Sequence, residues 1–226
     1  MGGILEKPAT DFLHTEADCP TGQRINADGE LNKNFVQYGV ADMQGWRVHM
    51  EDAHFMIPNF HGVDGLHFFA VMDGHGGERI AQIVADREIG LPSKLPENGL
   101  FKQFVDGGLS DPRLLQEAFT QVYLEYDQNL FDDWKRDMSD TSGCTAIAAM
   151  VTPTHILLIN SGDSRGVLVD QNGLVVFGTD DHKPINGPER ARIEAAGGCV
   201  EDNRVDGVRP FSFRCTLFSV TNSYSG

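Results

Sequence analysis

The chain has 226 residues and a formal net charge of −15, from 18 basic and 33 acidic residues. Nucleic-acid binding needs a surface rich in Lys and Arg, so this balance argues against a nucleic-acid partner. Hydrophobic residues make up 40% of the chain, enough for a buried core, and no apolar segment approaches the ~20 residues that span a bilayer.

Residues 1 to about 33 are polar and contain turn-forming residues, so we expect a flexible leader there. A glycine follows the initial Met, as N-myristoylation requires, but Glu6 stands where Ser or Thr is usual. This favours an unmodified start and leaves membrane association through Gly2 open. The four cysteines form no C-x-x-C pair and no secretory pattern is present, so we expect free thiols in a reducing compartment, the cytoplasm or nucleus.

Beyond the leader, the hydrophobic pattern predicts strands, then helices, then hairpin-linked strands. The first strands are expected at 35–41, 52–57 and 66–72, followed by a helix within 77–91 and a long helix from Asp111-Pro112 towards Lys135. Further strands are expected at 144–151, 155–160, 166–170 and 174–177, and a last helix from near Pro188 to Gly197-Gly198. This order predicts an α+β fold with antiparallel sheet.

The most informative cluster is the run from Val71 to Gly77, which follows a strand-like apolar segment. Its glycines force an abrupt turn at the strand end. Asp73, His75 and the carbonyl of Gly74 are thereby held together, and hard divalent cations prefer such oxygen ligands.

A second cluster, at 45–54, supplies Arg47, Glu51 and Asp52. The guanidinium of Arg47 offers two parallel donors to phosphate oxygens. The two adjacent acids are suited to holding metal-bound waters. His75 is the natural general acid, since a histidine side chain exchanges a proton near neutral pH. Taken singly, each residue is more often an ordinary turn or surface residue, but two compact clusters together indicate metal-dependent phosphoryl transfer.

Five ordered motifs resemble the PP2C (PPM) family of metal-dependent serine/threonine protein phosphatases. They span Met43 to His54, Phe69 to Gly77, Ser142 to Ala146, Asn160 to Arg165, and Thr179 to Pro184 with Glu189 to Gly198. The resemblance extends over about Val36 to Val208. It implies a PP2C-like β-sandwich of antiparallel sheets flanked by helices, and hydrolysis of phosphoserine and phosphothreonine in proteins by metal-activated water.

The resemblance also implies roles for particular residues. Asp73 would bridge two Mg²⁺ or Mn²⁺ ions, Gly74 would give its carbonyl to one, and Glu51 and Asp52 would contact metal-bound waters. Asp163 matches an acid of a weaker third metal site. Arg47 would bind the substrate phosphate and His75 would protonate the leaving group. We expect a monomer that acts on phosphoprotein substrates.

After Val208 the chain departs from the family pattern. Residues 209–226 contain no Asp or Glu, and the later Asp-Gly and Asp-Asn motifs that complete the dinuclear centre have no counterpart. We therefore expect a leader at 1–33, a phosphatase domain at 34–208 that is incomplete at its C-terminus, and a divergent tail at 209–226. Residues 211–220 could form one strand that partly covers the gap. A splice variant or a gene-model artefact would explain such a tail equally well.

These departures lead us to expect weak metal binding, marginal stability and reduced activity. The alternative function is a catalytically impaired PP2C-like binding protein that competes for substrates or regulators. A zinc hydrolase is not supported, because no H-E-x-x-H motif occurs and His49 and His54 lie five positions apart.

Overall fold

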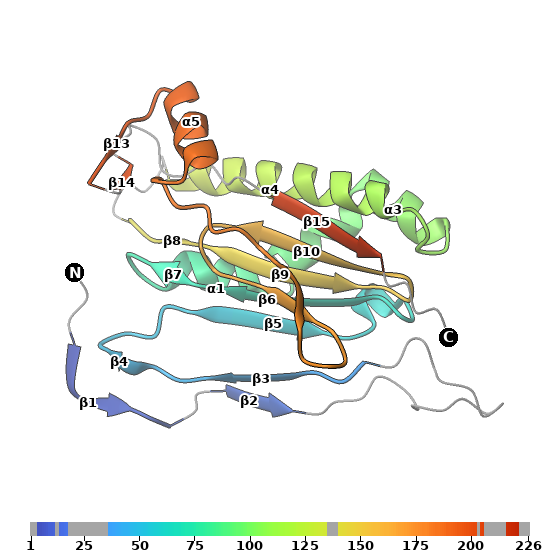
Figure 1. The fold of residues 1–226 in the computed structure, drawn as a ribbon, viewed down its shortest axis with the longest axis horizontal. Helices are drawn as coiled ribbons and strands as arrows, with labels where there is room; N and C mark the ends of the chain where they lie inside the picture. The colour runs from blue at the N-terminus through green and yellow to red at the C-terminus, as the bar shows by residue number, and fades with distance from the viewer. Residues whose placement is uncertain are drawn as a thin grey trace.

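The computed structural model describes residues 4–11, 14–17, 36–134, 140–202, 204–205 and 216–221. Its largest sheet has five strands in the order β15-β10-β9-β6-β5, and every neighbouring pair is antiparallel (Figure 1). The strands are β5 (Ala53–Ile57), β6 (His67–Met72), β9 (Ala146–Val151), β10 (His155–Ser161) and β15 (Thr216–Thr221). The predicted α+β class with antiparallel sheet is confirmed.

One face of this sheet is buried against helices, as the alternation of side chains requires. On β6, Phe68 and Met72 are fully buried while Val71, on the opposite face, is 39% exposed. Phe68 lies at the centre of the core, where its ring contacts those of Phe55, Phe60 and Phe119 at centroid distances of 4.7, 5.2 and 5.4 Å. The core therefore sits between the sheet and the helical layer.

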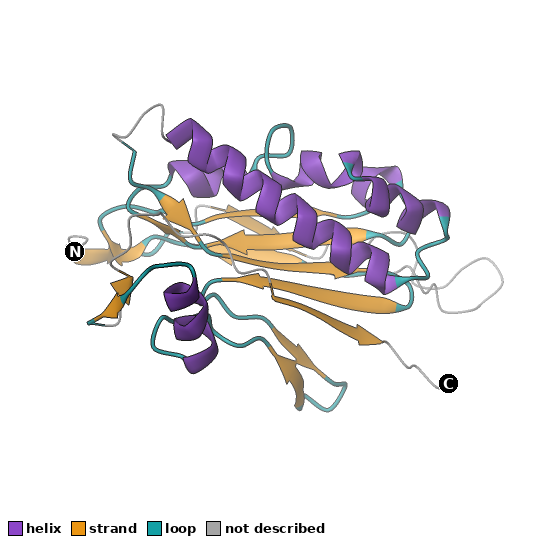
Figure 2. Cartoon of the chain, turned by 90° about the horizontal axis from the view of Figure 1, so that it is seen from above, coloured by secondary structure: helices purple, strands orange, loops and turns teal. Residues whose placement is uncertain are grey.

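Four α-helices lie in that layer, and Figure 2 shows them on one side of the strands. They are α1 (Arg79–Ala85), α2 (Leu91–Lys94), α3 (Gly99–Asp106) and α4 (Pro112–Trp134), with short 3-10 turns at Phe60–Gly62 and Leu95–Glu97. The predicted start of α4 after Asp111 is confirmed. Helix α3 was not predicted, although Asn98 caps it by accepting hydrogen bonds from the N–H groups of Leu100 and Phe101.

The helix expected over 77–91 is confirmed for 79–85, but its continuation to 91 is wrong, because the chain leaves α1 at Asp86. The Asp86 carboxylate accepts hydrogen bonds from the N–H groups of Glu88 and Ile89, which competes with a continued helix. Gly90 then lies so close to three backbone carbonyls, among them that of Val84, that a Cβ would approach them to 2.5–2.6 Å. This turn sends α2 in a new direction.

The opposite face of the sheet carries the hairpin of β11 (Val167–Val169) and β12 (Val175–Gly178). Gly166, at the start of the hairpin, lies against Ile147 and Leu158 of the outer sheet face. Helix α5 (Gly187–Ala195) lies on the same side (Figure 2). Within the described residues, this face is covered by the hairpin and by packing such as that of Tyr38 on Phe69, at 5.2 Å between ring centroids.

Short two-stranded pairs complete the described fold. They are β1 (Ile4–Ala9) with β4 (Gly45–Arg47), β2 (His14–Ala17) with β3 (Gly39–Asp42), β7 (Gly74–His75) with β8 (Gly143–Cys144), and β13 (Val200–Glu201) with β14 (Arg204–Val205). Two stretches of the expected flexible leader are thus strands, since the open edges of β3 and β4 offer backbone partners that composition does not reveal.

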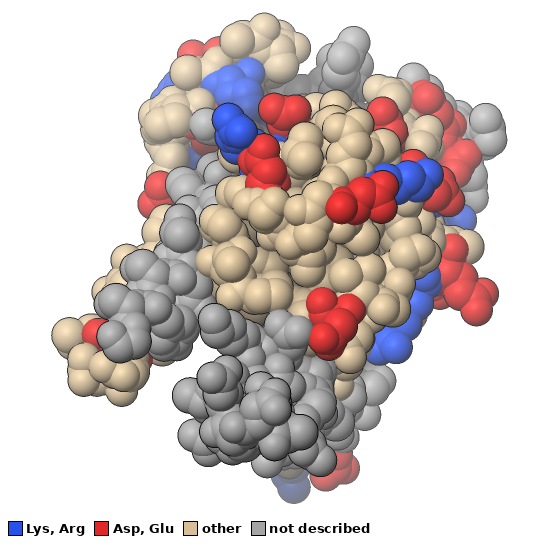
Figure 3. Space-filling view, turned by 90° about the vertical axis from the view of Figure 1, so that its right-hand side faces the viewer, with Lys and Arg blue, Asp and Glu red and all other residues tan. Residues whose placement is uncertain are grey.

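The predicted tail also contributes a strand, because β15 pairs with β10 over six residues from His155↔Thr221 to Asn160↔Thr216. The rest of the 211–220 prediction lies outside the described residues. The domain boundaries near 33 and 208 stay predictions. Among the described residues, no helix combines the length and apolar character needed to cross a membrane. Figure 3 shows basic residues as small patches, several of them beside acidic ones, on one face.

Candidate active site

The Asp73 turn lies where β6 ends and β7 begins. There β7 pairs with β8, with Gly74 opposite Cys144 and His75 opposite Gly143. The carbonyl of Asp73 accepts a hydrogen bond of 2.9 Å from the N–H of Thr145. The abrupt strand-end turn that the glycines predicted is therefore fixed by a second chain segment far along the sequence.

Gly74 joins the two sequence clusters through their backbones. A Cβ on Gly74 would collide with the carbonyl oxygen of Glu51 and lie 3.1 Å from the Glu51 Cβ. Only glycine permits this approach, since any side chain would force the two segments apart. Glu51 and the adjacent Asp52 are thereby held beside the Asp73 turn.

Three carboxylates interact electrostatically at this point. Partial burial and then the charge of Asp163 raise the pKa of Asp73. Partial burial and then the charge of Asp73 raise the pKa of Asp52. Like charges that disfavour each other's ionisation are characteristic of sites that hold cations.

Arg47 and His75 lie beside these acids. The positive charge of Arg47, at the end of β4, lowers the pKa of both Asp52 and Asp73 and so opposes the mutual repulsion. The His75 imidazole packs against Gly143, where a Cβ would come within 2.7 Å of Nε2. Both side chains belong to exposed residues, so both can reach a ligand from solvent.

A further acid was missed by the sequence analysis. Asp42 on β3 lies 3.3 Å from Nδ1 of His54 on β5, and both side chains are largely buried. Its charge also contributes to the raised pKa of Asp52. No sequence signal pointed to Asp42, because its proximity depends on how β3 and β5 are arranged in space.

The thiol of Cys144, which lies beside the turn, is not a candidate nucleophile. Burial raises the pKa of Cys144, which pairs with Gly74, to about 12. Only the thiolate is nucleophilic, so this side chain remains an inert part of the core.

The donor chemistry of the cluster fits a hard divalent cation, since it consists of carboxylate and carbonyl oxygens whose repulsion such an ion would relieve. Within the described part of the chain, however, no three His, Cys, Asp or Glu side chains converge closely enough to hold a metal ion. A cation here would therefore keep several water ligands.

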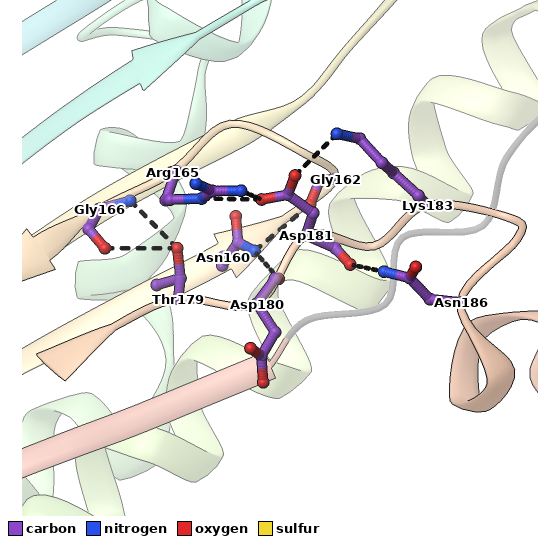
Figure 4. Close-up of polar contacts among 9 residues, drawn as sticks. All are labelled: Asn160, Gly162, Arg165, Gly166, Thr179, Asp180, Asp181, Lys183 and Asn186. Carbon is purple, nitrogen blue, oxygen red and sulfur yellow. Dashed lines mark hydrogen bonds and ion pairs between the residues drawn. The ribbon is translucent and has the colours of Figure 1, made fainter.

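Next to Asp163, a polar network ties β10 to the loop before α5 (Figure 4). The buried Asn160 donates from Nδ2 to the carbonyls of Gly162 and Asp180 at 3.3 and 2.9 Å. Asp181 lies between Arg165 and Lys183, at 2.9 and 2.8 Å. These contacts hold the residues on both sides of the Gly162–Ser164 turn.

An open hollow of about 740 Å³ adjoins this network. Its lining residues are Arg165, Gly178, Thr179, Asp180, Asp181, His182, Lys183, Asn186, Pro188 and Glu189. None of the predicted site residues lines it. The hollow and the carboxylate cluster are therefore formed by different residues.

The sequence is similar to that of known protein phosphatases. The protein phosphatase 2C family model matches residues 36–221. Protein phosphatase 1B of Mus musculus is 39% identical over 213 residues, covering 92% of this chain and 50% of that protein. Protein phosphatase 1A of Homo sapiens is 38% identical over 209 residues, with the same two coverages. The chain thus spans about half the length of these curated relatives.

Two solved structures share the fold. The serine-threonine phosphatase 2C from Toxoplasma gondii superposes with a TM-score of 0.59 at 23% identity, covering 88% of this chain and 60% of that one. The serine/threonine phosphatase Stp1 from Staphylococcus aureus gives 0.55 at 17% identity, covering 99% and 76%.

Proposed function

The chain belongs to the protein phosphatase 2C family, and from this premise we propose that it hydrolyses phosphoserine and phosphothreonine in proteins with the help of Mg²⁺ or Mn²⁺. The observation that supports the proposal is a chain of electrostatic contacts: the charge of Asp73 raises the pKa of Asp52, the charge of Asp163 raises that of Asp73, and Arg47 is close enough to lower both.

Bound metal would neutralise phosphoryl charge and lower the pKa of a bound water. We propose that Asp73 and the Gly74 carbonyl would hold two ions directly, and that Glu51 and Asp52 would hold them through water. Asp163 would serve a third ion. The contact of Gly74 with Glu51 supports this set, since it keeps both acids of the second cluster at the turn.

Arg47 and His75 act on the substrate. The Arg47 guanidinium orients the phosphate by donating to its oxygens. His75 holds a proton for the leaving serine or threonine oxygen. Its contact with Gly143 restricts the imidazole to one side of the turn, which supports this role.

The test is release of phosphate from a phosphopeptide by the purified 226-residue chain in millimolar Mn²⁺. Asp73→Asn, of nearly equal size, is the control. We expect the wild-type chain to release phosphate and the Asp73→Asn variant to release none. No turnover above the control, from protein shown by circular dichroism to be folded, would contradict the proposal.

A catalytically impaired binding protein is the second candidate, and one observation favours it. The described residues do not bring three metal-ligating side chains together. Such a protein would bind phosphopeptides through Arg47 without hydrolysing them. Equilibrium binding of a phosphopeptide by wild type, lost in Arg47→Ala, together with no turnover would identify this case.

We propose a phosphatase domain at 34–208 that works as a monomer on phosphoprotein substrates in the cytoplasm or nucleus. The free thiol of Cys144 is compatible with such a reducing compartment.

A further inference from the structure

Thr145, between β8 and β9, forms hydrogen bonds with both the main-chain N–H and the main-chain carbonyl of Asp73. Its N–H donates to the Asp73 carbonyl at 2.9 Å. Its hydroxyl oxygen accepts from the Asp73 N–H at 3.3 Å. The orientation of the Asp73 backbone, and so the starting direction of its side chain, therefore depends on this threonine.

The same side chain contacts the turn that carries Asp163. The Thr145 hydroxyl shares a hydrogen bond of 2.5 Å with the hydroxyl of Ser164. On the other side of Asp163, a Cβ on Gly162 would come within 2.7 Å of the Thr145 methyl carbon. Thr145 thus touches the residues that flank Asp163 on both sides.

The turn that carries Asp163 is also held by His182. The Gly162 carbonyl accepts from the His182 N–H at 2.9 Å, and the Gly162 N–H donates to Nδ1 of His182 at 3.3 Å. Because His182 holds this turn, the side chain of Thr145 determines how far the turn lies from the end of β6.

We propose that Thr145 is a positioning residue that sets the separation of Asp73 and Asp163, and thereby the affinity of this site for a divalent cation. The inference deepens the proposed function and rests on it. The repulsion that Asp163 exerts on Asp73 is consistent with it. Residues that orient metal ligands without touching the ion typically change metal affinity by about 10–100-fold when replaced.

The experiment measures binding of Mn²⁺ alone, from the loss of the free-ion electron paramagnetic resonance signal, with the full 226-residue chain. Thr145→Val keeps the shape and removes the hydroxyl, whereas Thr145→Ser keeps the hydroxyl. We expect Val to weaken Mn²⁺ binding by about 10-fold or more, and Ser to restore most of the wild-type affinity.

Thr120→Val is the matched control, because the Thr120 hydroxyl donates to the Gln116 carbonyl within α4. It should leave Mn²⁺ affinity unchanged. If Thr145→Val binds Mn²⁺ as tightly as wild type, or if Thr145→Val and Thr145→Ser lose affinity equally, the positioning role of Thr145 is wrong. The proposed metal site would still stand. Wild-type binding no tighter than that of Asp73→Asn would instead overturn the proposed metal site, and the inference with it.

Should Thr145→Val fail to fold, Ser164→Ala breaks the same hydroxyl pair from the other side. Weaker Mn²⁺ binding is expected there as well. An unchanged affinity in folded Ser164→Ala would then overturn the inference.

Discussion

Gly74 is the residue at which the two functional clusters meet, so it offers the sharpest single-residue test. In Gly74→Ala the new methyl group would displace the backbone of Glu51. We expect at least a ~10-fold loss of Mn²⁺ affinity and a loss of about 1–3 kcal/mol of stability, as for other strained backbone sites. Mn²⁺ titration and thermal unfolding measure the two effects.

Gly187→Ala is the matched control, since a Cβ at Gly187 meets nothing within 4 Å and the residue begins α5. It should leave affinity and stability nearly unchanged. Equal behaviour of the two alanine variants would contradict the argument that the contact with Glu51 requires glycine.

Asp73 gives a prediction about pH. Its pKa is raised above the usual 3.8 in the folded chain, so between 3.8 and the raised value the folded state binds more protons than the unfolded state. Stability therefore falls as pH rises through that window, and the penalty persists above it. Asp73→Asn removes the penalty. Without metal at pH 7, we expect its melting temperature to rise by about 1–3 °C, because solvent screening keeps the effect below about 1 kcal/mol.

The control for this experiment is Glu125→Gln, which removes one charge from an exposed position on α4. It separates the local repulsion from the general effect of net charge. The rise in melting temperature of Asp73→Asn should become smaller as the pH is lowered towards 3.8. If it does not, or if Glu125→Gln raises the melting temperature equally, the effect does not come from repulsion around Asp73.

At the scale of elements, Tyr126 ties α4 to the turn that separates α1 from α2. Its buried hydroxyl lies 3.4 Å from the carbonyl of Ile83 and 3.2 Å from that of Ile89. Burial raises the pKa of this phenol to about 12, so it remains a donor at all ordinary pH values. This hydroxyl therefore joins α4 to both ends of the α1–α2 connection through buried polar contacts.

Tyr126→Phe should cost about 1 kcal/mol, because two carbonyls lose a buried donor while the ring is retained. A fall of roughly 2–4 °C in melting temperature corresponds to that loss. An unchanged melting temperature would show that the hydroxyl does not join the helices.

For the whole molecule, the tail segment matters because β15 closes one edge of the main sheet. The strand it covers, β10, contains the fully buried Leu157, Ile159 and Asn160. A chain ending at 208 would expose the backbone edge of β10, and such edges promote association. We expect it to unfold at lower temperature and to form oligomers in light scattering, whereas a chain ending at 221 should behave as the full chain does. Equal behaviour of both truncations would argue against a stabilising role for β15.

Much of the fold could be predicted from the sequence, because its strongest signals are local. The apolar run at 66–72 and the proline after Asp111 were enough to place β6 and the start of α4. The split between α1 and α2 could not be predicted, since it depends on the Asp86 side chain and on carbonyls around Gly90. Strands β1 and β2 were missed because a polar edge strand has no hydrophobic pattern of its own.

By itself, the sequence determined the antiparallel α+β class and the protein phosphatase 2C family, because ordered motifs and side-chain periodicity are properties of the chain alone. Only the tertiary structure decided which groups act on one another. The pairing of Asp42 with His54, the contact of Gly74 with Glu51 and the position of Thr145 between Asp73 and Ser164 all join segments that are distant in sequence. Such contacts arise from the packing of strands and turns, and Coulomb and hydrogen-bond energies depend on the resulting distances, which sequence spacing does not fix.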